Sequence, residues 1–160
     1  MATTSREDFN RQLLEFVELC RNLNGPFWSL QKSAIGELYA KNTSSVVMDD
    51  ETLSREVHIT FNEVYSVPTL WFNFYRRDGR PLKLSEIRKA LKLEEDSSIP
   101  HLTQNEHPNL GVIFFNIHPC NTAKVMKELK IDGNYIARWI TIYGAEVGIS
   151  LPANFFAENP

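Results

Sequence analysis

The amino-acid sequence predicts an α+β fold, in which a helix precedes a meander of antiparallel strands and more helices follow. Three observations support this class. Apolar residues recur at helical spacing in residues 5–23, strand-like alternation runs through residues 27–77, and helical segments return after residue 84. The chain has 160 residues, 42% hydrophobic and 23% charged. This composition is typical of a globular protein with a buried core, and we expect residues 1–160 to form one domain.

The first helix is predicted at residues 5–23. Ser5 suits the N-cap position, and Asn24-Gly25-Pro26 is a strong stop signal. Cys20 belongs to the apolar stripe of this helix, so we expect it to be a small core residue. The stripe consists of Phe9, Leu13, Phe16, Val17, Cys20 and Leu23.

Four strands are predicted before residue 77. The polar residues 41–45 are predicted to be a turn between the second and third of them. Asp78-Gly79-Arg80-Pro81 then ends the fourth strand with residues typical of turns. The strands are expected at residues 27–30, 36–40, 56–65 and 67–76.

The second half of the chain is predicted to mix helices with one strand. Residues 94–110 form a long polar stretch with two prolines and two histidines, which predicts a functional loop or a disordered one. The apolar run 112–117 predicts a strand, and residues from 152 onward are expected to form a tail. Helices are expected at residues 84–91, at 121–130 with Asn121 as the cap, and at 135–149.

Charge and hydropathy argue against several classes of protein. The net charge is −3 and no run is rich in lysine or arginine, which argues against a nucleic-acid surface. No segment reaches the ~20 apolar residues of a membrane span, and the polar residues 1–10 do not predict a signal peptide. Two cysteines without an export signal predict free thiols in a reducing compartment, so we expect a cytoplasmic protein.

The strongest chemical signal is His118-Pro119-Cys120, which follows the apolar run 112–117. Proline ends a strand because it has no N–H for the ladder. Cys120 is therefore expected on rigid backbone at a strand end, directly before the presumed cap Asn121. A thiolate near a helix N-terminus is favoured by the local dipole, and His118 is close enough to polarise it. Local sequence leaves two readings open, a nucleophile and an inert thiol at a turn.

Other kinds of site fit the sequence less well. Structural zinc sites use close ligand pairs, and the spacing of the available residues does not match them. We expect no metal and no organic cofactor. The chain also lacks a Gly-rich phosphate loop and a Gly-x-Ser-x-Gly elbow. The residues that could serve as metal ligands are His101, Glu106, His107, His118 and Cys120.

Several motifs, in order along the chain, resemble the autophagy-related protein 10 family. Its sister, the autophagy-related protein 3 family, also has His-Pro-Cys and a similar following helix. The Asp-Gly-Arg-Pro-Leu and Arg-Trp segments favour the protein 10 family. The matching motifs are Val64-Tyr65-Ser66-Val67-Pro68-Thr69-Leu70, Asp78-Gly79-Arg80-Pro81-Leu82, Glu106-His107-Pro108-Asn109-Leu110, Phe115-Asn116-Ile117-His118-Pro119-Cys120-Asn121-Thr122, Arg138-Trp139-Ile140 and Val147-Gly148-Ile149-Ser150-Leu151-Pro152.

This resemblance implies a fold similar to ubiquitin-conjugating enzymes, with a curved antiparallel sheet flanked by helices. It implies that Cys120 carries autophagy-related protein 12 as a thioester, received from the activating enzyme, autophagy-related protein 7, and transfers it to a lysine of autophagy-related protein 5. The lipid-linked modifier, autophagy-related protein 8, is a further candidate partner. The resemblance assigns His118 to the polarity of the thioester site and Tyr65 to positioning of the acceptor. Asn109, in His107-Pro108-Asn109, remains an alternative to His118 as the group that supports the oxyanion.

Three alternatives to this function remain open. The first is the sister activity, in which the acceptor is the amine of phosphatidylethanolamine. The second is a non-catalytic adaptor that keeps the conjugating fold. The third is a Cys-His hydrolase, which needs a histidine brought to Cys120 by the fold.

Overall fold

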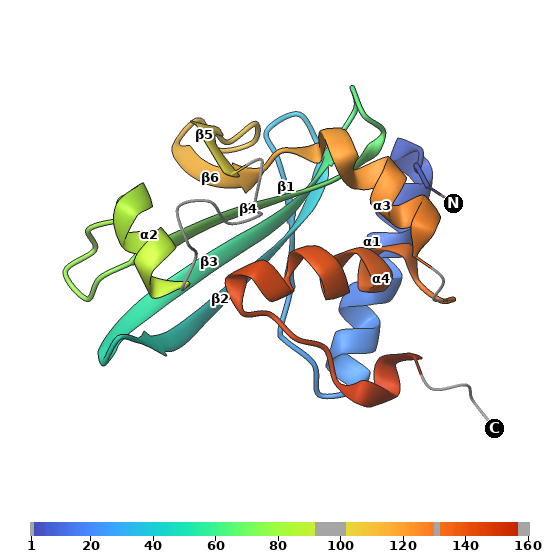
Figure 1. Ribbon diagram of the computed structural model, residues 1–160. Coiled ribbons are helices and arrows are strands. Elements are labelled where there is room, and N and C mark those ends of the chain that lie inside the picture. Colours follow the sequence, from blue (N-terminus) through green and yellow to red (C-terminus); the bar gives the residue numbers. More distant parts are fainter. Residues whose placement is uncertain (1, 92–101, 130–131, 157–160) are drawn as a thin grey trace.

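The core of the protein is a twisted antiparallel sheet with strand order β1-β2-β3-β4-β6-β5 (Figure 1). The computed structural model describes residues 2–91, 102–129 and 132–156. The strands are β1 (Ser29–Lys32), β2 (Leu38–Met48), β3 (Glu51–Asn62), β4 (Val67–Tyr75), β5 (Leu102–Glu106) and β6 (Ile113–Ile117). The helices are α1 (Arg6–Asn22), α2 (Leu84–Ala90), α3 (Thr122–Glu128) and α4 (Tyr135–Tyr143), with 3₁₀ turns η1 (Pro119–Asn121), η2 (Ala145–Val147) and η3 (Ala153–Phe156).

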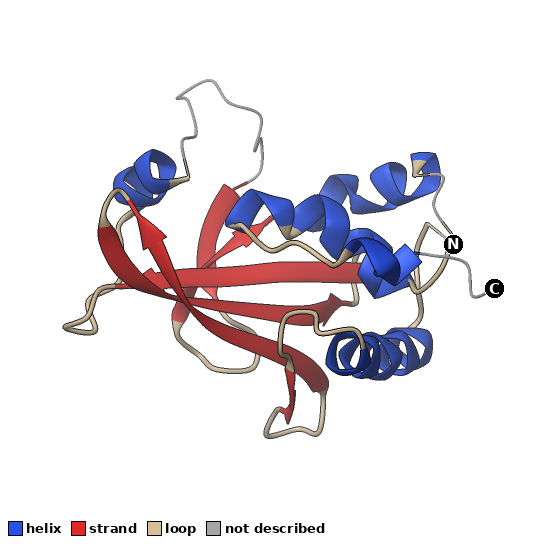
Figure 2. Cartoon of the chain, turned by 90° about the horizontal axis from the view of Figure 1, so that it is seen from below, coloured by secondary structure: helices blue, strands red, loops and turns tan. Residues whose placement is uncertain are grey.

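The helices are not spread evenly around the sheet. Helices α1 and α4 pack against each other and against the sheet. Helix α2 lies at one end of the molecule and α3 at the other (Figures 1 and 2). Buried side chains of both helices, such as Phe9 and Ile140, form one core with Ile59 and Phe72 of the sheet. This arrangement confirms the predicted α+β class.

The first helix is close to the prediction. The Ser5 hydroxyl caps its N-terminus by accepting a hydrogen bond from the Asp8 N–H at 3.1 Å. Cys20 is 1% exposed, which confirms it as a core residue. Burial raises the pKa of the Cys20 thiol to about 12, so this cysteine is unreactive at neutral pH.

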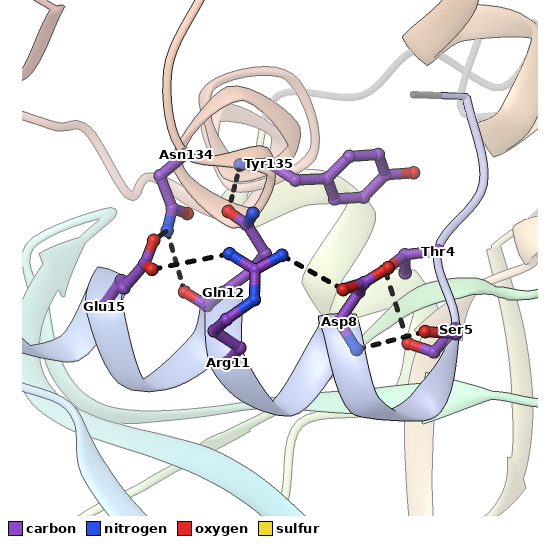
Figure 3. A network of polar contacts seen from close by, with 8 residues as sticks. All are labelled: Thr4, Ser5, Asp8, Arg11, Gln12, Glu15, Asn134 and Tyr135. Atoms are coloured by element: carbon purple, nitrogen blue, oxygen red, sulfur yellow. Dashed lines mark hydrogen bonds and ion pairs between the residues drawn. The ribbon is translucent and has the colours of Figure 1, made fainter.

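A polar junction connects α1 to the start of α4 (Figure 3). Asn134 caps α4 by accepting from the Ala137 N–H at 3.0 Å, and its amide donates to the Gln12 carbonyl of α1 at 2.8 Å. The Tyr135 N–H donates to the Gln12 side chain at 3.0 Å. Two of the otherwise unpaired N–H groups at the N-terminus of α4 are thereby bonded, one of them to α1. The junction fixes where α4 begins.

The turn predicted at residues 41–45 is wrong, because these residues lie inside β2. They pair with β3 from Lys41 opposite His58 to Ser45 opposite Ser54. The reversal comes later, at Asp49 and Asp50, whose φ angles of 48° and 60° form a two-residue hairpin turn. Pairing along a long β3 compensates here for the weak strand preference of polar residues. The third strand also begins earlier than predicted and ends at Asn62.

The polar stretch predicted as a loop is partly a strand. Residues 102–106 form β5 and pair with β6, while residues 94–101 lie outside the described residues. Within the described chain, the β4–β6 ladder has only the pairs Trp71–Asn116 and Phe72–Phe115, and the Asn73 side chain adds one bond to the Ile113 carbonyl at 3.0 Å. The β5–β6 hairpin is therefore connected to the other strands by a short ladder.

The C-terminal helices are shorter than predicted. A 3₁₀ turn precedes α3, and the Asn121 side chain makes no capping bond there. Helix α4 ends at Tyr143, before Gly144 and the turn η2, although the periodicity predicted a helix to residue 149. The predicted tail contains η3, whose Phe155 and Phe156 pack on the core. None of the helices in the described residues is long and apolar enough to cross a membrane.

Candidate active site

The His-Pro-Cys motif builds a single 3₁₀ turn at the end of β6. His118 is the N-cap, and its Nδ1 accepts a hydrogen bond from the Cys120 N–H at 3.2 Å. Pro119 occupies the first position of the turn, where the missing N–H breaks no bond. The Cys120 side chain is exposed. Proline thus starts a turn as well as ending the strand, and the turn presents the thiol to solvent.

The hydrogen bond to Cys120 assigns the neutral tautomer of His118. Because Nδ1 accepts, the ring proton lies on Nε2. A ring in this state cannot take the thiol proton through Nδ1 without losing its bond to the backbone. It can donate through Nε2–H to a negative oxygen. The geometry therefore suits a stabilising group better than a general base.

Tyr65 lies beside His118. The two rings meet edge to face, with centroids 5.6 Å apart, and Tyr65 is 39% exposed. The turn that carries Tyr65 is held at both sides. Its own N–H donates to the Asn62 side chain at 3.0 Å, and the next carbonyl, that of Ser66, accepts from the Thr4 N–H at 2.8 Å. Tyr65, His118 and Cys120 thus come together from two separate parts of the chain.

Tyr143 is a further residue at this site, which the sequence analysis did not identify. Its hydroxyl is hydrogen-bonded to the side chain of Thr122, two residues after Cys120. Burial raises the pKa of the Tyr143 phenol above its ordinary value, the Thr122 bond opposes this rise, and the negative charge of a Cys120 thiolate adds to it. The phenol therefore stays protonated at neutral pH. The sequence shows Tyr143 only as one member of a helical stripe.

His107 and Asn109 are arranged differently from the cysteine site. His107 is 1% exposed and packs against the rings of His58 and Trp71. The distances between ring centroids are 4.8 Å and 5.1 Å, respectively. Its Nδ1 accepts from the Asn109 N–H at 3.1 Å, and burial lowers the pKa of His107 to about 4. Among the described residues, the Asn109 side chain makes no hydrogen bond to Cys120. The His107 side chain is thus part of the core, and His118 is the histidine that bonds to the Cys120 backbone.

The residues considered as metal ligands are not brought together. His107 is enclosed by aromatic rings, whereas His118 and Cys120 lie on the η1 turn. No group of three histidine, cysteine or acidic side chains in the described ranges is arranged to hold a metal ion. His101 lies outside those ranges.

The fold matches a solved structure, the crystal structure of the autophagic E2 Atg10. The TM-score is 0.60 at 16% sequence identity, and the match covers 91% of this chain and 98% of the other. The chain therefore has the fold of this E2 structure, a helix-flanked antiparallel sheet, with an exposed cysteine on the turn after β6.

Residues 29–154 match the family model of the autophagocytosis associated protein, active-site domain. The chain belongs to this family. It is 34% identical over 117 residues to the ubiquitin-like-conjugating enzyme ATG10 of Homo sapiens, a match that covers 66% of this chain and 53% of the human protein. For ATG10 of Arabidopsis thaliana the identity is 31% over 120 residues, with the same two shares. The predicted resemblance to the protein 10 family is confirmed, and the chain spans about half the length of these curated relatives.

The sister family matches over a shorter stretch. Autophagy-related protein 3 of Dictyostelium discoideum is 37% identical over 78 residues, which cover 49% of this chain and 22% of that protein.

Proposed function

We propose that this chain is a ubiquitin-like-conjugating enzyme that carries autophagy-related protein 12 on Cys120 and transfers it to a lysine of autophagy-related protein 5. The observation that carries the proposal is the exposed Cys120 thiol on a turn fixed by His118, in a chain whose relatives are named ubiquitin-like-conjugating enzymes. Autophagy-related protein 7 would supply the activated modifier. A thiol used in this way must stay reduced, which supports a cytoplasmic location.

The chemistry has two steps. In the first, the Cys120 thiolate attacks the thioester carbonyl at the modifier's C-terminus, and the thiol of the activating enzyme leaves. In the second, a neutral lysine amine attacks the new thioester, the carbonyl oxygen becomes negative, and the C–S bond breaks. An isopeptide bond forms, the amine proton passes to solvent, and Cys120 is regenerated.

His118 and Tyr65 would act in the second step. The Nε2–H of His118 is a donor beside the thioester, so we assign it to the negative oxygen of the tetrahedral intermediate. Tyr65 packs on the His118 ring and remains partly exposed, which suits positioning of the incoming acceptor. Neither role requires a metal or an organic cofactor.

The decisive experiment is a charging assay with activating enzyme, ATP and modifier. The wild-type chain is expected to form an adduct that reductant cleaves, and Cys120→Ser an adduct that resists reductant, because an oxygen ester replaces the thioester. Cys20→Ser is the matched control and is expected to charge normally, since Cys20 is buried. A reductant-sensitive adduct in Cys120→Ser would contradict the assignment of the nucleophile, and absence of charging would favour the adaptor.

The similarity to autophagy-related protein 3 makes lipid conjugation the second candidate. It is tested by loading the chain with autophagy-related protein 8 and adding phosphatidylethanolamine vesicles. Transfer to the lipid in preference to autophagy-related protein 5 would move the assignment to the sister activity. Cleavage of a modifier ester without ATP would instead indicate a hydrolase.

A further inference from the structure

An open groove of about 440 Å³ begins beside the cysteine turn. His118 and Pro119 line it, so one part of the groove lies directly next to the turn that presents the thiol. Its floor includes Thr60, Thr69 and Asn116, which are buried polar side chains of three different strands. We call it the acidic groove, because Glu37, Glu63 and Glu106 line it.

Three glutamates and one arginine line the acidic groove. Arg6 lies 3.3 Å from the carboxylate of Glu37 and 3.1 Å from that of Glu63. Glu106 is exposed and, within the part of the chain that the structure describes, has no cationic partner. Three negative charges against one positive charge leave the lining with an excess of two negative charges. Such a surface attracts cations.

The floor of the groove contains an unused hydrogen-bonding group. Thr69 is 3% exposed, and among the described residues its hydroxyl has no hydrogen-bond partner. Its cross-strand neighbour Thr60 differs, because it accepts a bond from the indole N–H of Trp71 at 2.8 Å. Most buried hydroxyls in folded proteins are paired. The free hydroxyl of Thr69 is a second sign, independent of charge, that this surface binds a ligand.

The Glu106-His107-Pro108 motif gives the groove a rigid wall. Glu106 and Pro108 line the groove, while His107 between them is buried among aromatic rings. The His107 ring is also bonded to the backbone of Asn109. The proposed chemistry at Cys120 makes no use of this motif. The buried His107 therefore anchors the backbone that carries the Glu106 side chain at the groove.

We propose that the acidic groove binds a basic segment of the acceptor protein that flanks the attacked lysine. This inference rests on the proposed function. The modifier is held through its thioester, whereas the acceptor is held only by non-covalent contacts during transfer. The basic side chain that binds the groove is a neighbour of the attacking lysine and not that lysine itself. A carboxylate beside the attacking amine would favour the protonated, non-nucleophilic form of the amine.

The test uses Cys120 loaded with a glycine-ended peptide thioester, so that no activating enzyme is needed. Transfer of the thioester-linked peptide from Cys120 is followed with each of two acceptor peptides. One acceptor has a lysine between arginines, and the other has a lysine between serines. In Glu106→Gln, the half-saturating concentration of the arginine peptide is expected to rise about fivefold, an effect typical of one partly exposed charge. The maximal rate and the values for the serine peptide are expected to stay unchanged.

Glu18→Gln is the matched control, because Glu18 is an exposed glutamate of α1 outside the groove. It is expected to behave as wild type. Equal use of both peptides by wild type, or an unchanged preference in Glu106→Gln, would overturn the groove assignment.

A separate binding measurement distinguishes failure of this inference from failure of the proposed function. Fluorescence anisotropy of the labelled arginine peptide with the unloaded protein needs no chemistry at Cys120. We expect binding that weakens with salt and in Glu106→Gln. Loading failure with intact peptide binding would contradict the proposed function alone. Normal loading without charge-dependent binding would contradict the groove alone.

Discussion

His118 has two separable tasks at the cysteine turn. It accepts the Cys120 N–H through Nδ1, and in the proposed mechanism its Nε2–H donates to the thioester oxygen. We expect His118→Ala to slow transfer to the acceptor about 100-fold, the usual cost of removing one oxyanion donor. His118→Asn keeps a side chain suited to the N-cap and also has an amide donor, so it is expected to recover much of the rate. Single-turnover discharge of the thioester measures both, and equal defects in the two variants would contradict this role.

A second prediction concerns the effect of the Tyr143 hydroxyl on the reactivity of Cys120. Its phenol is protonated, is bonded to Thr122 and lies within electrostatic range of Cys120. Tyr143→Phe is expected to slow alkylation of Cys120 by iodoacetamide at neutral pH about threefold, because it removes a hydroxyl that interacts electrostatically with the Cys120 thiolate. Tyr135→Phe in the same helix is the control, because its hydroxyl donates to the Ala2 carbonyl at 2.7 Å. An unchanged rate-against-pH profile in Tyr143→Phe would remove Tyr143 from the site.

These residues differ in how far the sequence could identify them. Cys120 and His118 are two positions apart, so a local motif contains their geometry. Tyr65 was placed at the site by family resemblance, since no local rule connects it with His118 across 53 positions (118 minus 65). Tyr143 reaches Thr122 only because α4 packs beside the cysteine turn. Periodicity reports which face of a helix is apolar and cannot report what a hydroxyl on that face will meet.

At the scale of elements, the α1–α4 junction predicts a measurable loss of stability. Asn134→Ala removes the cap of α4 and the bond to the Gln12 carbonyl. We expect the free energy of unfolding to fall by about 1–2 kcal/mol. Arg80→Ala, which removes an exposed ion pair with Asp78 at 2.6 Å outside the junction, is expected to cost much less. Urea denaturation compares the two, and equal losses would show that the junction contributes little.

Elements with strong local signals could be predicted, and elements that depend on partners could not. Helix α1 has a cap, an apolar stripe and a stop signal, and its bounds agree with the prediction within a residue. Residues 41–45 and 102–106 lack strand-forming patterns of their own and become strands because β3 and β6 pair with them. A polar segment on the edge of a sheet looks like a loop when its partner is unknown.

At the scale of the whole molecule, the buried His107 makes stability depend on pH. Its pKa is about 4 in the folded protein against an ordinary value of 6.5. Between these values the unfolded chain binds the proton that the folded protein excludes, so stability is full above pH 6.5 and falls as the pH drops toward 4. The loss approaches about 3 kcal/mol, at about 1.4 kcal/mol per unit of pKa.

Urea denaturation at a series of pH values measures this loss. In His107→Phe the decline between pH 6.5 and 4 is expected to flatten. The decline below about pH 4.5 is expected to remain, because the His58 hydrogen bond holds the pKa of Glu56 below its ordinary value. A slope between pH 6.5 and 4 that persists in His107→Phe would assign the dependence to other groups.

The short ladder between β4 and β6 also determines which part of the sheet opens first. Beyond Trp71–Asn116 and Phe72–Phe115, the described hairpin has no β-ladder to the other strands, whereas β3 and β4 pair from Ser54–Tyr75 to Asn62–Val67. Amide hydrogens exchange through the least stable cooperative unit that contains them. The amides of β5 and β6 are therefore expected to take up deuterium before those of β3 and β4. The segment that ends at the cysteine turn is then expected to open as a unit while the rest of the sheet stays closed.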